Sequence, residues 1–134
     1  MAGIYKTWVM GLIRRSILNN DKIANEEFKD CPYNSLLQVS QNGEVKNKAT
    51  NEIMPKEIRN GCFIVKDPRG MTQYDNGSRD YEWVHRLVAL TWLTDSPAYM
   101  IGAVHHKDGN GLNNNVNNLE WLNANDHKRK HDIN

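Results

Sequence analysis

The chain has 134 residues, of which 39% are hydrophobic and 25% are charged, a composition that is typical of a folded globular protein and excludes a disordered tail. This length suits one compact domain, or one small catalytic unit with an N-terminal attachment, and argues against two large independent cores. The formal net charge is only +1, so any case for nucleic-acid binding must rest on local clusters of charge.

Two further observations narrow the class of protein. Cys31 and Cys62 lie far apart and outside any C-x-x-C pattern, which favours reduced thiols over a disulfide framework or a zinc ribbon. The apolar stretch over residues 8–18 is interrupted by two arginines and is too short to cross a bilayer. We therefore expect no membrane span, no signal peptide and a cytoplasmic location.

Residues 1–30 form a predicted N-terminal helical segment. Between Tyr5 and Leu18 the apolar side chains recur at steps of three and four positions, which places them on one face of a helix. We expect this face to belong to the core or to a dimer contact. Polar residues end the helix, and the segment from Ile23 to Asp30 is predicted to be a short helix or a linker.

Residues 31–80 are predicted to form a small β-rich module with an antiparallel sheet. Short extended runs at Leu37–Ser40, Glu44–Lys46 and Phe63–Lys66 alternate with turn residues. The Asn-Gly pairs at 42–43 and 60–61 indicate hairpin turns, because Asn and Gly tolerate the positive φ that such turns require.

Helical spacing returns between Trp83 and Leu93. The apolar residues of this stretch fall on one face, and Ser96-Pro97 follows the helix. His85 and Arg86 also lie on it. A single histidine is more often structural or merely exposed than functional, so we expect no chemical role for His85.

The most informative region begins at the end of a short apolar run. Val104 is followed by His105 and His106, and then by an Asp-Gly turn. Adjacent residues on a strand point to opposite faces, so the two histidines are not expected to share one task. In the Asn-rich run that follows, Asn110 and residues 113–115 are expected to be a solvated loop, because Asn favours turns.

A second pair of histidines lies on a predicted C-terminal helix that starts at Asn125-Asp126. His127 and His131 are four residues apart, which puts both imidazoles on one helical face and suits a divalent metal ion. With His105 they make three candidate ligands and leave coordination positions for water and a phosphate oxygen. On this spacing alone, a metal site and merely structural histidines stay open as alternatives.

The spaced elements of this region resemble the H-N-H nuclease motif in its phage and homing-endonuclease form. The resemblance is carried by His105 to Asn110, by Asn117 to Trp121 and by Asp126-His127. Upstream, Val84 to Ala89 resembles the helix that often precedes this motif. Residues 37–45 resemble the small NUMOD4 module that is often fused to such nucleases.

The resemblance implies an α+β fold with a C-terminal ββα-metal unit, also called a His-Me finger, that hydrolyses DNA phosphodiester bonds by nicking or double-strand cutting. His106 would be the general base, and Asn118 would brace the loop and orient His106. His105 and His127 would hold one divalent metal ion. His131 matches a third ligand that is found only in some branches of the family.

The resemblance does not identify which metal ion is bound. Homing-type nucleases more often have Asn or Asp at the position of His105 and Asn at that of His127. An all-imidazole site resembles the bacterial toxin nucleases and favours zinc, nickel or cobalt, whereas oxygen ligands favour magnesium. Mg²⁺ or Mn²⁺ is expected if phosphate and water complete the shell, with Zn²⁺ or Ni²⁺ as the alternative.

DNA is the expected partner of the predicted nuclease domain over residues 81–134, and the β-rich module would help to grip it. Basic side chains near the site could meet phosphates, although such clusters are as often solvated; they are Arg86, Lys107, Lys128, Arg129 and Lys130. A monomer would most simply nick one strand, whereas a homodimer could cut both.

Two alternatives belong to other classes of protein. The first is a DNA-binding module that keeps the nuclease fold without activity. The second is a structural zinc site made by His105, His127 and His131 and closed by a fourth group such as Asp108. Metal removal would unfold a protein with a structural site, whereas a catalytic site should lose activity before its fold.

Overall fold

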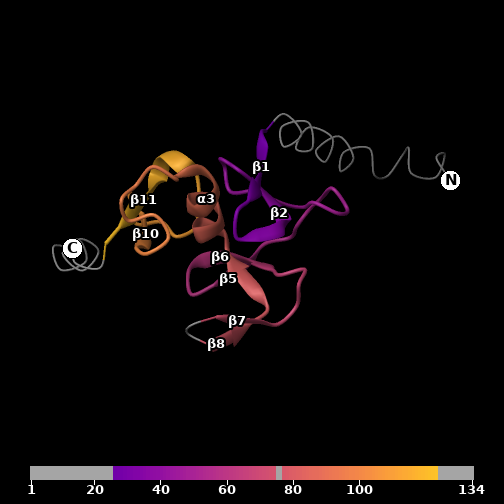
Figure 1. Ribbon diagram of the computed structural model, residues 1–134. Coiled ribbons are helices and arrows are strands. Elements are labelled where there is room, and N and C mark those ends of the chain that lie inside the picture. The colour runs from indigo at the N-terminus through magenta and orange to yellow at the C-terminus, as the bar shows by residue number, and fades with distance from the viewer. Residues whose placement is uncertain (1–25, 75–76, 124–134) are drawn as a thin grey trace, which may run out of the picture.

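The computed structural model describes residues 26–74 and 77–123. Within these residues the chain forms four small antiparallel sheets, one α-helix and one short 3-10 helix, which confirms the predicted α+β fold (Figure 1). No helix of this described part has the length and apolarity needed to cross a bilayer. The predicted helices at 5–18 and after Asn125 lie outside the described residues.

The first sheet has the strand order β1-β2-β3-β4. Its strands are β1 (Phe28–Cys31), β2 (Asn34–Ser40), β3 (Val45–Asn47) and β4 (Glu52–Ile53). The strands predicted at 37–40 and 44–46 are thereby confirmed. The predicted helix or linker up to Asp30 is wrong at Phe28–Asp30, because pairing with β2 outweighs the polar composition of this segment.

The remaining upstream strands form a three-stranded sheet and a separate hairpin. The sheet has the order β5-β6-β9 and contains β5 (Glu57–Arg59), β6 (Cys62–Lys66) and β9 (Tyr81–Trp83). The hairpin pairs β7 (Thr72–Tyr74) with β8 (Gly77–Arg79). The strand predicted at 63–66 corresponds to β6.

Both Asn-Gly pairs form turns between strands, but with different geometry. Asn60 and Gly61 have φ values of 52° and 77°, so both occupy the left-handed region that a two-residue hairpin turn requires. In the turn at 42–43, only Gly43 lies in the left-handed region, with a φ of 86°. That turn is longer, and the N–H of Ser40 donates to the carbonyl oxygen of Glu44 across it at 2.9 Å.

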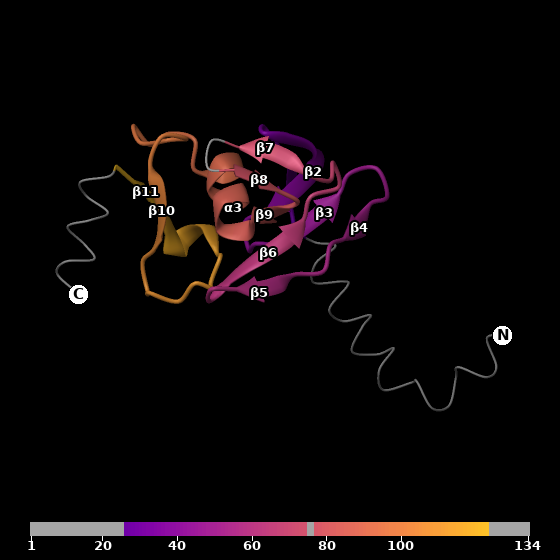
Figure 2. The same cartoon turned by 90° about the horizontal axis from the view of Figure 1, so that it is seen from below.

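The helix α3 (Val84–Trp92) confirms the helix predicted between Trp83 and Leu93. It is followed by β10 (Ala103–His106), the 3-10 helix η1 (Val116–Asn118) and β11 (Leu119–Leu122), and β10 pairs with β11. Figure 2 shows α3 at the centre of the molecule, with the β10-β11 hairpin on one side and β2, β3 and β6 on the other. The helix therefore links the hairpin to the upstream sheets.

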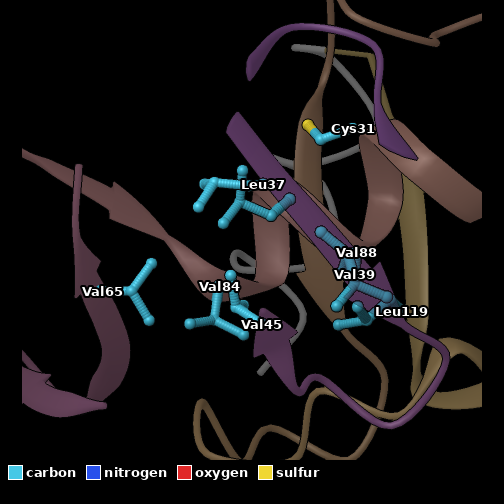
Figure 3. Packing of buried hydrophobic residues seen from close by; sticks show 9 residues of the cluster. Cys31, Leu37, Val39, Val45, Val65, Val84, Val88 and Leu119 are labelled. Carbon is cyan, nitrogen blue, oxygen red and sulfur yellow. The ribbon is translucent and has the colours of Figure 1, made fainter. Parts of the chain in front are cut away.

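The larger of two hydrophobic clusters in the described part of the chain lies around α3 (Figure 3). Its buried members come from both sides of residue 80: Cys31, Leu37, Val39, Val45, Val65, Val84, Leu87, Val88 and Leu119. In addition, the indole N–H of Trp92 donates to the carbonyl oxygen of Val39 at 2.9 Å. The division of the chain at residues 30 and 80 stays a prediction, and described residues on both sides of residue 80 share this core.

Candidate active site

The two histidines of the motif lie at the end of β10. In the antiparallel pair, His105 is opposite Glu120 and His106 is opposite Leu119. Both side chains are half-buried. Because they are neighbours on a strand, their side chains point to opposite faces of the hairpin, so the two imidazoles are placed for different tasks.

The loop from Lys107 to Asn118, which joins β10 to β11, is held by side-chain-to-backbone turns. The side-chain oxygen of Asp108 accepts the N–H of Asn110 at 2.8 Å, and that of Asn110 accepts the N–H of Leu112 at 3.0 Å. Asn115 accepts the N–H of Asn117 in the same way at 2.9 Å. These turns give a physical reason for the Asn-rich composition of the loop.

Asn118 closes this loop. Its amide nitrogen donates to Oδ1 of Asp108 at 2.8 Å and to the carbonyl oxygen of Asn113 at 2.9 Å. Its Oδ1 accepts the N–H of Asp108 at 3.0 Å. Within the described residues, no hydrogen bond joins the side chains of Asn118 and His106, so the orienting role assigned to Asn118 stays a prediction.

The polar contact with the ring of His106 is made by Asn114. Nε2 of His106 lies 2.8 Å from Oδ1 of Asn114, and Asn114 is only 4% exposed. The expectation that Asn114 belongs to a solvated loop is therefore wrong. Its burial results from packing against Gly43 in the β2-β3 turn. No local pattern separates Asn114 from Asn113 and Asn115, so its role could not be predicted from the sequence.

A third histidine ring touches His106. The rings of His85 and His106 meet edge to face with centroids 5.0 Å apart, and Trp83 lies 5.8 Å beyond His85. Burial, together with the neighbouring His106 and Arg86, lowers the pKa of His85 to about 4. His85 is therefore neutral at pH 7 and places no positive charge beside His106.

The basic residues that are predicted to contact DNA differ in their surroundings. Nη2 of Arg86 donates to the carbonyl oxygen of Met100 at 3.1 Å, and the guanidinium lies 5.3 Å from the centroid of the Trp121 ring. Lys107 is exposed at the start of the loop. The other predicted site residues lie outside the described part of the chain: His127, Lys128, Arg129, Lys130 and His131.

A hollow of about 340 Å³ opens beside His105 and His106. The β5-β6 turn and two glycines of the loop, Gly109 and Gly111, complete its lining. Residues 26–74 and 77–123 contain no group of three His, Cys, Asp or Glu that could hold a metal ion. The metal ligands predicted at His127 and His131 lie beyond residue 123, so the predicted metal site stays a prediction.

Gly111 lies directly against the β5-β6 turn. A Cβ added there would stand 2.4 Å from the carbonyl oxygen of Gly61 and 2.8 Å from Sγ of Cys62. We expect Gly111→Ala to push the loop outward and lower the free energy of unfolding by about 1–3 kcal/mol, as measured by denaturant titration. Asn117→Ala, at an exposed position of the same loop, should change it by less than about 0.5 kcal/mol. Equal stability of the two variants would contradict this contact.

Comparison with known proteins yields relatives of one kind, although no family model matches the chain. An uncharacterized HNH endonuclease of Acanthamoeba polyphaga mimivirus is 31% identical over 95 residues, which cover 71% of this chain and 26% of that protein. DNA endonuclease I-HmuI of Bacillus phage SP01 is 33% identical over 101 residues, which cover 72% of this chain and 52% of I-HmuI.

The fold is similar to that of a solved relative. A structure of the HNH homing endonuclease I-HmuI, solved to describe DNA binding and cleavage, matches with a TM-score of 0.59 and 26% identity, over 80% of this chain and 58% of that one. The chain belongs to the HNH endonuclease family, as the motif predicted. It spans about half the length of I-HmuI and about a quarter of the mimivirus relative. The NUMOD4 resemblance stays a prediction.

Proposed function

We propose that this chain carries the active site of a metal-dependent DNA endonuclease of the phage-encoded homing type. The observation that carries the proposal is the likeness to I-HmuI over 80% of the chain, beside which stands the β10-β11 hairpin with His106 at the end of β10. The proposed reaction is hydrolysis of a DNA phosphodiester bond. The proposed place of action is the cytoplasm of the host cell.

His106 is the proposed general base. Hydrolysis requires a group that takes a proton from the attacking water, and an imidazole with one unoccupied nitrogen can do this near neutral pH. Nε2 of His106 is engaged by Asn114, which leaves Nδ1 for the water. The neutral ring of His85 beside it does not oppose the positive charge that His106 acquires.

One divalent metal ion is the proposed cofactor, held by His105, His127 and His131. When bound, the ion would stabilise negative charge on the scissile phosphate and on the leaving 3′ oxygen. Mg²⁺ or Mn²⁺ suits a site that water and phosphate oxygens complete, and Zn²⁺ or Ni²⁺ suits the imidazole ligands. The hollow beside His105 offers space for such a site.

DNA phosphates are the proposed partners of the basic residues around this site. Lys107 lies exposed one position after His106, where a backbone phosphate near the scissile bond could reach it. Arg86 and the basic run at 128–130 are proposed to contact phosphates farther along the strand. Two copies arranged as a homodimer would cut both strands, whereas one copy would nick.

The structural-zinc alternative is weakened by the contacts of Asp108. Both of its carboxylate oxygens accept hydrogen bonds within the loop, and the bond from Asn113, with two weaker donors, holds the pKa of Asp108 below its usual value. Three hydrogen bonds thus occupy most of the roughly four lone-pair sites of this carboxylate in shaping the loop. This makes Asp108 a poor fourth ligand for zinc.

Incubation with supercoiled plasmid tests the proposed function. We expect EDTA-treated protein to be inactive and to regain cleavage when one of Mg²⁺, Mn²⁺, Zn²⁺ or Ni²⁺ is restored, with relaxed circles indicating nicking and linear DNA indicating double-strand cutting. Circular dichroism of the EDTA-treated protein should show a retained fold. Absence of cleavage with every ion would favour the inactive DNA-binding module, and unfolding on metal removal would favour structural zinc.

A further inference from the structure

We propose that Asn114 is a positioning residue for His106: it fixes the orientation of the imidazole and keeps its proton on Nε2. This inference rests on the proposed function, because it concerns the residue that acts there as general base. It is carried by the buried contact between Oδ1 of Asn114 and Nε2 of His106, at 2.8 Å.

The chemistry of the two groups fixes the direction of this hydrogen bond. A side-chain amide oxygen only accepts hydrogen bonds, so Nε2 of His106 must carry the hydrogen. A neutral imidazole has one N–H, and Nδ1 therefore carries the lone pair. A base needs that lone pair toward the water it deprotonates, and the contact with Asn114 selects the tautomer that provides it.

The surroundings of Asn114 hold its side chain in place. A Cβ at Gly43 would stand 2.8 Å from Cβ of Asn114, so the β2-β3 turn is in close contact with it. Next to this contact, the N–H of Val116 donates to the carbonyl oxygen of Gln41 at 2.8 Å. The turn of the first sheet thus packs against Cβ and the carbonyl oxygen of Asn114 and limits the movement of its backbone.

Asn114 and Asn118 therefore have separate tasks. The amide group of Asn118 is used by Asp108 and by the carbonyl oxygen of Asn113, which closes the loop. The amide oxygen of Asn114 is used by His106, and its amide nitrogen is buried without a partner among the described residues. A buried amide N–H without a hydrogen-bond partner costs free energy of folding. Such an amide is therefore expected where its oxygen makes a functional hydrogen bond.

Three variants of the 134-residue chain test the inference. Asn114→Leu keeps the approximate size of the side chain but has no acceptor, Asn114→Asp keeps an acceptor oxygen, and Asn117→Ala changes an exposed asparagine of the same loop. We expect Asn114→Leu to lower kcat for plasmid cleavage by about 10–100-fold and to change KM less than about twofold. Losses of this size are typical when the hydrogen-bond partner of a metal-ligating side chain is removed. Asn114→Asp should recover most of kcat, and Asn117→Ala should match the wild type.

The tautomer of His106 provides a readout that does not depend on cleavage. Nitrogen-15 spectra of the neutral imidazole should show Nε2 protonated and Nδ1 unprotonated in the wild type and in Asn114→Asp. In Asn114→Leu the two nitrogens should move toward averaged shifts, because nothing fixes the proton. If the wild type cleaves no DNA, the proposed function fails while this spectrum still tests Asn114.

An unchanged kcat or an unchanged tautomer in a folded Asn114→Leu protein would overturn the inference. A merely structural role would instead lower thermal stability and leave the kcat of the folded fraction and the nitrogen shifts as they are. If Asn114→Leu does not fold, Asn114→Ala replaces it with the same expected results. Failure of both to fold leaves Asn114→Asp, for which loss of the Nε2–H tautomer would contradict the inference.

Discussion

His106→Ala is expected to abolish plasmid cleavage while DNA binding and metal binding persist. A positioned general base contributes about 10²–10⁴-fold to a rate, so the remaining activity should be about 1% of the wild type or less. Binding should survive because His106 is half-buried, and its described contacts are with Asn114 and His85. The substitution therefore removes a proton acceptor without removing an exposed charge.

Two binding assays are needed beside the cleavage assay to interpret this result. DNA affinity is measured by fluorescence anisotropy of a labelled duplex, and metal affinity by calorimetry. His105→Ala is the matched variant, because His105 is the adjacent histidine on the opposite face of β10; it should weaken metal binding, whereas His106→Ala should not. If His106→Ala loses DNA binding together with cleavage, the role assigned to His106 is wrong.

The local patterns of the sequence predicted several elements well. Apolar spacing of three and four positions predicted α3, because a helix needs one continuous apolar face wherever it packs. Asn60-Gly61 predicted a hairpin turn, because its requirement for positive φ lies within two residues. The strand at Phe28–Cys31 was missed, since its partner β2 and not its own composition makes it a strand.

The residues of the site could likewise be predicted only where they form a local pattern in the sequence. His106 and Asn118 stand out because their residue types and spacing form a motif. Asn114 does not, because its burial depends on Gly43, which lies in the β2-β3 turn and is far away in the sequence. The contact between His85 and His106 was missed for a similar reason: α3 and β10 meet only in the folded chain.

Leu87→Ala is expected to cause the largest loss of stability, about 2–5 kcal/mol in the free energy of unfolding. Leu87 is fully buried in α3, within the core that joins the first sheet and the β5-β6-β9 sheet to the β10-β11 hairpin. Truncating it leaves a cavity that close-packed neighbours cannot fill. Denaturant titration measures the change, and Ile101→Ala, at a position 85% exposed, should stay within about 0.5 kcal/mol of the wild type.

The same variant tests how the chain is divided. Leu87 packs in one cluster with Val39 and Val45 of the first sheet and with Leu119 of the hairpin. If this shared core makes 31–123 one cooperative unit, the amides of Val39 and Val104 should lose hydrogen-exchange protection together and by similar amounts in Leu87→Ala. Loss at Val104 with unchanged protection at Val39 would instead mean that 31–80 folds independently of the nuclease domain. In that case the support of Asn114 by Gly43 would be a contact between two domains.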